Sequence, residues 1–446
     1  MKKVLLILAA GVVFIALLVC LVWQPKSNPT KFSVAAPLPP GKVTPQLVST
    51  WGTGILLAPD GSLWAWGGGQ LQIQGLLGSS TVSATIPHRV SADSDWHSVD
   101  AGYTHALALK SDGSLWGWGN NGSGQLAQPG AKNPYAKPLR IGTETNWTQI
   151  SAGAGHSLAL KSDGSIWAWG QNEHGQVGDG TRSNQFNVTR VSQDNDCQYI
   201  AAGAFNSYAL KRNGTVWGWG FDPTATRSND SLSPKQIDPG TNWVSISASD
   251  FSLLALKSDG TLWIYGQNAV LSATRYVKQS ASAFVQIGAD RDWQSVYAGQ
   301  GFFYARKCDG TWWISGINDR GQLAPGRALG AGLPAPRRPG INFEPWAFVT
   351  GSGNCLLLTQ DGTLWTWGER IGEASRLGTW EQLKDKWNRL MTRWLKRAYP
   401  VPLPQPKIDS APYKLWELPA DMRRLRAGNT ASTIQSATNA AAIEHW

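Results

Sequence analysis

Cysteine, histidine and charged residues are all scarce in this chain of 446 residues. It has four cysteines and six histidines, and only 16% of its residues are charged. The cysteines are too few and too scattered for a disulfide framework, and no Cys-x-x-Cys, His-x-Glu or His-x-x-x-His spacing occurs. We therefore expect no metal site, and the compartment has to be inferred from targeting signals.

Catalytic motifs are missing as well. The sequence has no Gly-x-Ser-x-Gly elbow, no phosphate-binding glycine loop and no paired carboxylates beyond those of its repeat. The expectation is a protein that is not an enzyme and that takes neither a cofactor nor a small-molecule substrate.

A concentrated basic surface is also absent from the main body of the chain. Residues 46–368 hold 22 basic and 22 acidic side chains, whereas residues 1–45 carry five lysines and no acid, and residues 369–446 carry thirteen basic and eight acidic residues. Because phosphate neutralisation supplies most of the affinity for nucleic acid, a neutral body argues against a nucleic-acid partner.

Glycine and tryptophan, by contrast, are abundant, with 49 and 25 copies. One motif recurs seven times: Asp-Gly-Ser/Thr, an apolar residue, Trp, any residue, an aromatic residue and Gly. Its copies are 46 to 52 residues apart, and a fixed period near 50 with strand-like content is typical of a β-propeller. The motifs begin at Asp60, Asp112, Asp163, Asn213, Asp259, Asp309 and Asp361.

The third unit shows how one blade forms. Residues 147–153 form a short strand that ends at glycine, and residues 156–160 alternate as a second strand. Asp163-Gly164 supplies the tight hairpin, and residues 166–170 run back, with a further outer strand in each unit. We expect the tryptophans of the Trp-x-Trp positions to fill the core between blades. His105 and His156 share a repeat position with Thr53, Asn206, Ser252, Phe302 and Asn354, so we interpret them as structural.

The run at residues 101–119 and 152–170, Ala-Gly-x-x-His-x-x-Ala-Leu-x-x-Asp-Gly-x-x-Trp-x-Trp-Gly, resembles the repeat of the regulator of chromosome condensation (RCC1) family, in its bacterial type. So do the Gly-Gln-Leu/Val loops at residues 124–126, 175–177 and 321–323. The resemblance covers residues 44–368 and resumes at 412–435. It implies an interaction platform of a kind shared by nucleotide-exchange factors, ligase-associated domains and bacterial secreted inhibitors.

The sequence thus predicts an all-β, seven-bladed β-propeller, with an eighth degenerate blade as the alternative. Residues 46–368 form the repeats, and residues 412–446 supply strands that close the ring with the N-terminal repeat. Residues 1–23 contain an apolar run long enough to cross a bilayer, and Pro-rich residues 24–45 form a stalk. Lys2 and Lys3 would hold the N-terminus in the cytoplasm and place the propeller on the extracytoplasmic side, periplasmic or extracellular. A cleaved signal or a lipidated cysteine is the alternative.

Two surfaces are candidates for binding. The first is a collar of aromatic residues in the loops after each Ala-Gly element, and aromatic side chains of this kind dominate interface hot spots. The alternative is that each packs over its own blade. The collar consists of Trp51, Tyr103, Phe205, Phe251, Phe302 and Phe303.

The second candidate lies in an insertion at residues 369–411, where tryptophan and leucine recur at helical spacing. This predicts an amphipathic basic helix that contacts an anionic membrane or a partner, or that docks on the propeller by its tryptophans. Its candidate contact residues are Lys384, Trp387, Arg389, Arg393, Trp394, Lys396 and Arg397.

These features favour a membrane-anchored protein-interaction module with a protein partner. A nucleotide-exchange-like regulator of a small GTPase, which would need a cytoplasmic propeller, is one alternative. An enzyme inhibitor or a binder of cell-surface glycans is another.

Overall fold

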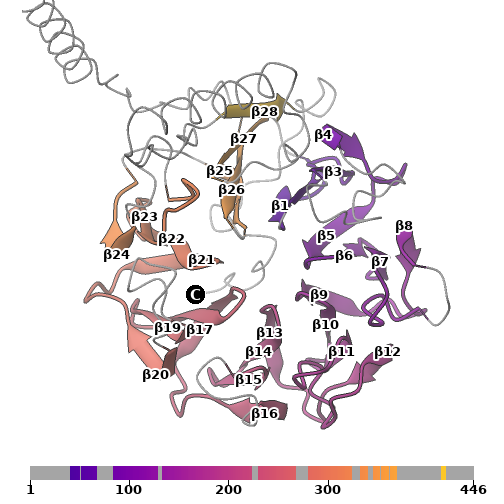
Figure 1. Cartoon of the computed structure of the whole chain (residues 1–446), viewed down its shortest axis with the longest axis horizontal. Coiled ribbons are helices and arrows are strands. Elements are labelled where there is room, and N and C mark those ends of the chain that lie inside the picture. The colour runs from indigo at the N-terminus through magenta and orange to yellow at the C-terminus, as the bar shows by residue number, and fades with distance from the viewer. Residues whose placement is uncertain are drawn as a thin grey trace, which may run out of the picture.

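Seven four-stranded antiparallel sheets form a ring around a central axis (Figure 1). This computed structural model describes residues 41–50, 52–67, 84–128, 133–222, 230–267, 280–323, 332–339, 345–351, 353–360, 362–368 and 413–417. In each sheet the four strands follow one another in chain order. The prediction of an all-β, seven-bladed propeller is confirmed, and the described residues form seven blades.

Each blade takes its strands from one unit of the repeat. Blades one to four consist of β1 (Gln46–Ser49), β2 (Thr53–Leu57), β3 (Leu63–Gly67) and β4 (Ala84–Arg89); β5 (Trp96–Ala101), β6 (His105–Lys110), β7 (Leu115–Gly119) and β8 (Tyr135–Arg140); β9 (Trp147–Ala152), β10 (His156–Lys161), β11 (Ile166–Gly170) and β12 (Gln185–Arg190); and β13 (Cys197–Ala202), β14 (Asn206–Lys211), β15 (Val216–Gly220) and β16 (Ser231–Gln236). Blades five to seven consist of β17 (Trp243–Ala248), β18 (Ser252–Lys257), β19 (Leu262–Gln267) and β20 (Ser280–Gln286); β21 (Trp293–Gly299), β22 (Phe302–Lys307), β23 (Trp312–Gly316) and β24 (Leu333–Arg337); and β25 (Pro345–Thr350), β26 (Asn354–Thr359), β27 (Thr363–Gly368) and β28 (Tyr413–Glu417).

A short relay of hydrogen bonds explains the Asp-Gly-Ser-x-Trp motif. In blade three, Asp163 Oδ1 accepts bonds from the N–H and the hydroxyl of Ser165, at 2.8 and 2.6 Å. The indole N–H of Trp167 donates to the same hydroxyl at 3.0 Å. Gly164 supplies the positive φ, +84°, that the hairpin requires. The Asp is therefore a turn residue, as the sequence predicted, and the hydroxyl residue orients the first tryptophan.

The hydrophobic core is divided among the joints between blades. Seven clusters of buried residues are found in the described part of the chain, one at each joint. Between blades two and three, for example, Leu107 and Leu115 pack with Ile150 and Trp169, all at most 5% exposed. Because a blade is apolar on both faces, it is stable only when it lies between two neighbours.

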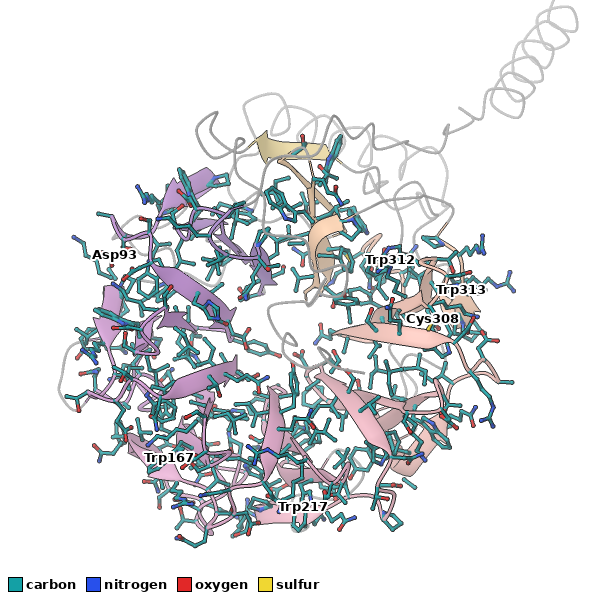
Figure 2. The ribbon with its side chains drawn as sticks, turned by 180° about the vertical axis from the view of Figure 1, so that it is seen from behind. Asp93, Trp167, Trp217, Cys308, Trp312 and Trp313 are labelled. Carbon is teal, nitrogen blue, oxygen red and sulfur yellow. The ribbon has the colours of Figure 1, made fainter. Side chains whose placement is uncertain are left out.

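The two tryptophans of each Trp-x-Trp pair occupy different environments. The second, such as Trp118 or Trp169, is fully buried between blades, as expected. The first is partly exposed in all seven blades, which corrects the prediction that both fill the core. Figure 2 shows Trp167 and Trp217 at the outer rim of the ring. Both tryptophans of a pair lie on one face of the strand, and the first is two residues nearer the hairpin, where its indole N–H donates to the Ser or Thr hydroxyl.

Among the described strands, blades one and seven each contain only strands of their own repeat. The sequence suggested that C-terminal strands would complete the N-terminal repeat, but β28 pairs with β27 as the fourth strand of blade seven, and β1 to β4 form the whole of blade one. The joint between these blades is held by side chains. Ser49 Oγ donates to Asn354 Oδ1 at 2.8 Å, and Leu47 and Trp66 pack with Val349.

The predicted anchor at 1–23, the whole insertion at 369–411 and most of the stalk at 24–45 lie outside the described residues. Across the part of the chain that the structure describes, no helix is long and apolar enough to cross a membrane.

Candidate functional site

The loops that join the first and second strands of the seven blades meet at one mouth of the central channel. Small residues line this mouth, among them Ala101-Gly102, Ala152-Gly153, Ala202-Gly203 and Ala298-Gly299. The cavity that they enclose has a volume of about 70 Å³. This accommodates a few water molecules and is well below the few hundred Å³ of a typical small-molecule site.

Three polar side chains from different blades meet over this channel. Asp250 follows β17 in blade five, and its carboxylate accepts a bond from Gln300 Nε2 of blade six at 2.6 Å. The carboxylate also accepts a bond from the hydroxyl of Tyr103, which comes from blade two. Burial raises the pKa of Asp250, whereas these two hydrogen bonds act in the opposite direction. The three residues thus link distant blades and partly cover the channel.

An aromatic patch lies beside this link and consists of Phe205, Phe221, Phe251 and His174. The rings of Phe205 and Phe251 are 6.3 Å apart between centroids, and Phe221 lies 5.8 Å from Phe251. The His174 ring completes the patch at 5.5 Å from Phe205 and 5.2 Å from Phe221. All four side chains are partly exposed.

Backbone hydrogen bonds hold the loops of this patch in place. Ala204 N–H donates to Asp250 O at 3.1 Å, so the residues that follow, Phe205 and Phe251, lie next to each other. Phe221 N–H donates to Phe205 O at 2.8 Å. These bonds order the aromatic residues before any partner binds, which lowers the entropic cost of association.

A buried carboxylate fixes His174. Asp230 Oδ2 lies 3.0 Å from His174 Nδ1 and 2.8 Å from Arg182 Nη1, and the Asp230 side chain is 0% exposed. The backbone N–H of His174 donates to Gln176 Oε1 at 2.9 Å. The histidine is therefore held from both its backbone and its ring.

The described residues of the predicted collar lie in three different environments: the channel, the aromatic patch and the core. Tyr103 lines the channel, whereas Phe205 and Phe251 belong to the aromatic patch. Phe302 and Phe303 are 0% exposed and pack in the core, so they cannot contact a partner. Their burial follows from register: they begin strand β22, one and two residues beyond the loop. Trp51 lies outside the described residues.

Sequence reasoning missed Phe221 and His174 as members of the patch. Phe221 directly follows the Trp-Gly-Trp-Gly element of blade four, where blades two and three have Asn120 and Gln171. That departure from the repeat was a usable signal. His174 carried no such signal, because its contacts come from another blade.

His105 and His156 are structural, as the sequence indicated, but they bond across blades. His105 Nε2 lies 2.8 Å from Ser157 Oγ of the next blade, and His156 Nε2 lies 3.0 Å from Ser207 Oγ. Both rings are 0% exposed. Burial lowers the pKa of each to about 3, so both are neutral at physiological pH.

For metals, no group of three or more His, Cys, Asp or Glu side chains in the described ranges is placed to hold an ion. The candidate helix residues Lys384, Trp387, Arg389, Arg393, Trp394, Lys396 and Arg397 lie outside those ranges.

This geometry defines a class: a closed β-propeller whose inter-blade joints are filled and whose distinctive surface is a rigid aromatic patch at one mouth of the channel. The model of the regulator of chromosome condensation (RCC1) repeat matches residues 112–160 and 163–210, and a second model of the same repeat matches residues 96–125 and 147–176. The chain is therefore an RCC1-like repeat protein.

Curated relatives and solved structures agree with this result. The mouse secretion-regulating guanine nucleotide exchange factor is 33% identical over 156 residues, which are 30% of this chain and 33% of that protein. The ultraviolet-B receptor UVR8 of Arabidopsis thaliana is 32% identical over 136 residues, which are 30% of each chain. The matches thus span about a third of these relatives.

Among solved structures, Prp20p of Saccharomyces cerevisiae superimposes with a TM-score of 0.61 at 20% identity, over 75% of this chain and 85% of that one. Human WBSCR16 superimposes with a TM-score of 0.59 at 19% identity, over 69% and 84%. At these identities the similarity establishes the fold.

Proposed function

We propose that this protein is a binding platform for a protein partner, with the aromatic patch as its contact surface, and that it acts by binding and not by catalysis. The observation that carries the proposal is that four aromatic rings from three blades are packed together, held by backbone bonds and left partly exposed. Phenylalanine is enriched in the cores of protein interfaces, and side chains that are already ordered bind at a lower entropic cost.

We further propose that residues 1–23 anchor the chain in a membrane, with the propeller on the extracytoplasmic side. The apolar length of this segment and the two lysines before it support the proposal. A reporter active only outside the cytoplasm, fused after residue 446, is expected to be active. Activity of a cytoplasmic reporter at the same position would contradict the proposed topology.

Regulation of a small GTPase is the second candidate function. It is favoured by the similarity to the mouse guanine nucleotide exchange factor and to Prp20p, whose structure was described with its binding to Gsp1p and histones. Because this function needs a cytoplasmic propeller, the same reporter pair separates the two candidates.

The test of the binding platform is chemical crosslinking and capture from membranes. The tagged full-length protein is compared with a variant carrying Phe205→Ser and Phe251→Ser. Phe186→Ser provides the matched control, because Phe186 on β12 is 44% exposed and lies outside the patch.

All three proteins should first show the same thermal transition. A partner that is captured by wild type and by Phe186→Ser but lost from the double variant supports the platform. Capture that is equal in all three shows that the patch is not the contact surface.

A further inference from the structure

The aromatic patch has acidic neighbours. Three of the acids adjoin a patch residue in the chain: Glu173 precedes His174, Asp222 follows Phe221, and Asp250 precedes Phe251. Glu173 is exposed, and Asp222 and Asp250 are partly exposed.

Acids outnumber bases in the sequence segments that surround the patch. Arg182 is paired with buried Asp230 at 2.8 Å, and it donates to the backbone oxygen of Glu173, also at 2.8 Å. Over residues 171–184, 221–230 and 249–251 the sequence holds five acids and two arginines, a net charge of −3. The protein as a whole carries +10, so the surroundings of the patch have the opposite sign.

From this arrangement we infer the chemistry of the partner: a polypeptide segment in which an apolar side chain is flanked by lysine or arginine. The inference rests on the proposed function and deepens it. The apolar side chain packs on Phe205, Phe221 and Phe251, and the cationic groups lie over Glu173 and Asp222.

Two physical effects favour such a segment. Carboxylates attract the cations and speed association, and they repel an acidic partner. The faces of exposed aromatic rings add a cation–π attraction, which a desolvated lysine or arginine gains and a neutral side chain does not. The same acids disfavour nucleic acid and anionic lipid, because both present phosphate groups.

An unbiased peptide library tests the inference without a known partner. Random 12-residue peptides displayed on phage are selected on the full-length protein, with the Phe205→Ser/Phe251→Ser variant used to remove peptides that bind elsewhere. We expect the patch-dependent peptides to carry a net positive charge and at least one large apolar residue.

Selected peptides are then measured against a Glu173→Gln/Asp222→Asn variant, with Phe186→Ser as the control. The charge variant should weaken binding about tenfold at low salt and much less at high salt, and Phe186→Ser should leave binding unchanged. Neutral or acidic patch-dependent peptides, or equal binding by the charge variant, would overturn the inference while leaving the platform intact.

Two further outcomes overturn the inference in other ways. If light scattering shows that wild type self-associates and the Phe205→Ser/Phe251→Ser variant does not, the occupant is a second copy of this chain. If no patch-dependent peptide is found, the inferred chemistry is wrong. The crosslinking experiment then decides separately whether the platform itself survives.

Discussion

Lys161 Nζ lies 4.0 Å from the ring centroid of Trp167 and 4.8 Å from that of Trp147. The two indoles meet edge to face, and Glu144 Oε1 lies 2.6 Å from the ammonium nitrogen. Equivalent lysines lie over tryptophans in blades two, four, five and six. In these five blades the partly exposed tryptophans are therefore contacted by the chain's own cations, which explains why they need not form a ligand platform.

Lys161→Met should lower the free energy of unfolding by about 1 to 2 kcal/mol, because the methionine keeps most of the apolar stem but loses the cation–π and ionic attraction. Urea unfolding followed by tryptophan fluorescence measures the change. Lys137→Met on β8 is the control, since Lys137 is exposed. An equal loss in both variants would show that the indole pair contributes nothing specific.

The joint between blades six and seven suggests a double substitution for the joint between blades three and four. Phe302 and Cys355 stand there in place of His156 and Ser207, and Cys355 Sγ contacts Gln322 O just as Ser207 Oγ contacts Gln176 O. The double variant His156→Phe/Ser207→Cys should fold with a stability at pH 7 within about 1 kcal/mol of wild type.

At acidic pH the free energies of unfolding of the two proteins should differ. The pKa of His156 is about 3 in the folded chain and 6.5 ordinarily, so the unfolded chain binds the extra proton between these values. Wild type therefore loses stability as pH falls below 6.5, and the variant should lose roughly 2 kcal/mol less between pH 7 and 4.5. Parallel curves for the two proteins would contradict this account.

Asp100 should have the opposite pH dependence. Burial raises its pKa to about 7, against 3.8 ordinarily, although the N–H groups of Ala101 and Ala152 donate to its carboxylate at 2.8 and 2.9 Å. The folded chain holds this proton between pH 4 and 7 and the unfolded chain does not. The stability that Asp100 contributes is thus greatest at low pH and is lost as pH rises toward 7.

Asp100→Ser is the informative replacement, because Ser151 already accepts the equivalent bond from Ala202 N–H at 3.0 Å. The unfolding free energy of wild type minus that of Asp100→Ser should decrease from pH 4 to pH 7 and stay constant above pH 7. Asp100→Asn should be less stable at every pH, since its NH2 group replaces one of the two oxygens that accept these bonds and leaves one N–H without an acceptor. A constant difference between wild type and Asp100→Ser would refute the assignment.

Tyr103→Phe should raise the pKa of Asp250 further. The tyrosine hydroxyl donates to the charged carboxylate and stabilises it. Without this hydroxyl the carboxylate keeps the bond from Gln300, while burial continues to disfavour the charged form. A carbon-13 titration of aspartate carboxyl groups measures the shift, with Asp250→Asn to assign the signal. An unchanged titration would mean that the bond across the channel does not form in solution.

The blades could be predicted because everything that defines them is local. Asp163, Gly164, Ser165 and Trp167 lie within five residues of one another, and the strands on either side pair with each other. The last strand, β28, was also recognisable from its sequence. Its partner was not, because pairing with β27 across the insertion depends on where the ring closes.

The site depended on finer geometry. Between Gly299 and Phe302 a step of two residues takes the side chain from the channel to the core: Gln300 bonds Asp250, and Phe302 is fully buried. The sequence placed aromatic residues near the mouth but could not assign them to either side. The contact between His174 and Phe205 joins two blades, so no local sequence pattern predicts it.

The joint between blades one and seven has a mechanical consequence. Six of the seven joints are crossed by the polypeptide itself, whereas this one is held by packing and by the bond from Ser49 to Asn354. Among the described residues, a force that pulls blades one and seven apart is therefore opposed at this joint by non-covalent contacts alone. We expect the ring to open first at this joint, which exposes the apolar faces of blades one and seven that Leu47 and Val349 help to bury.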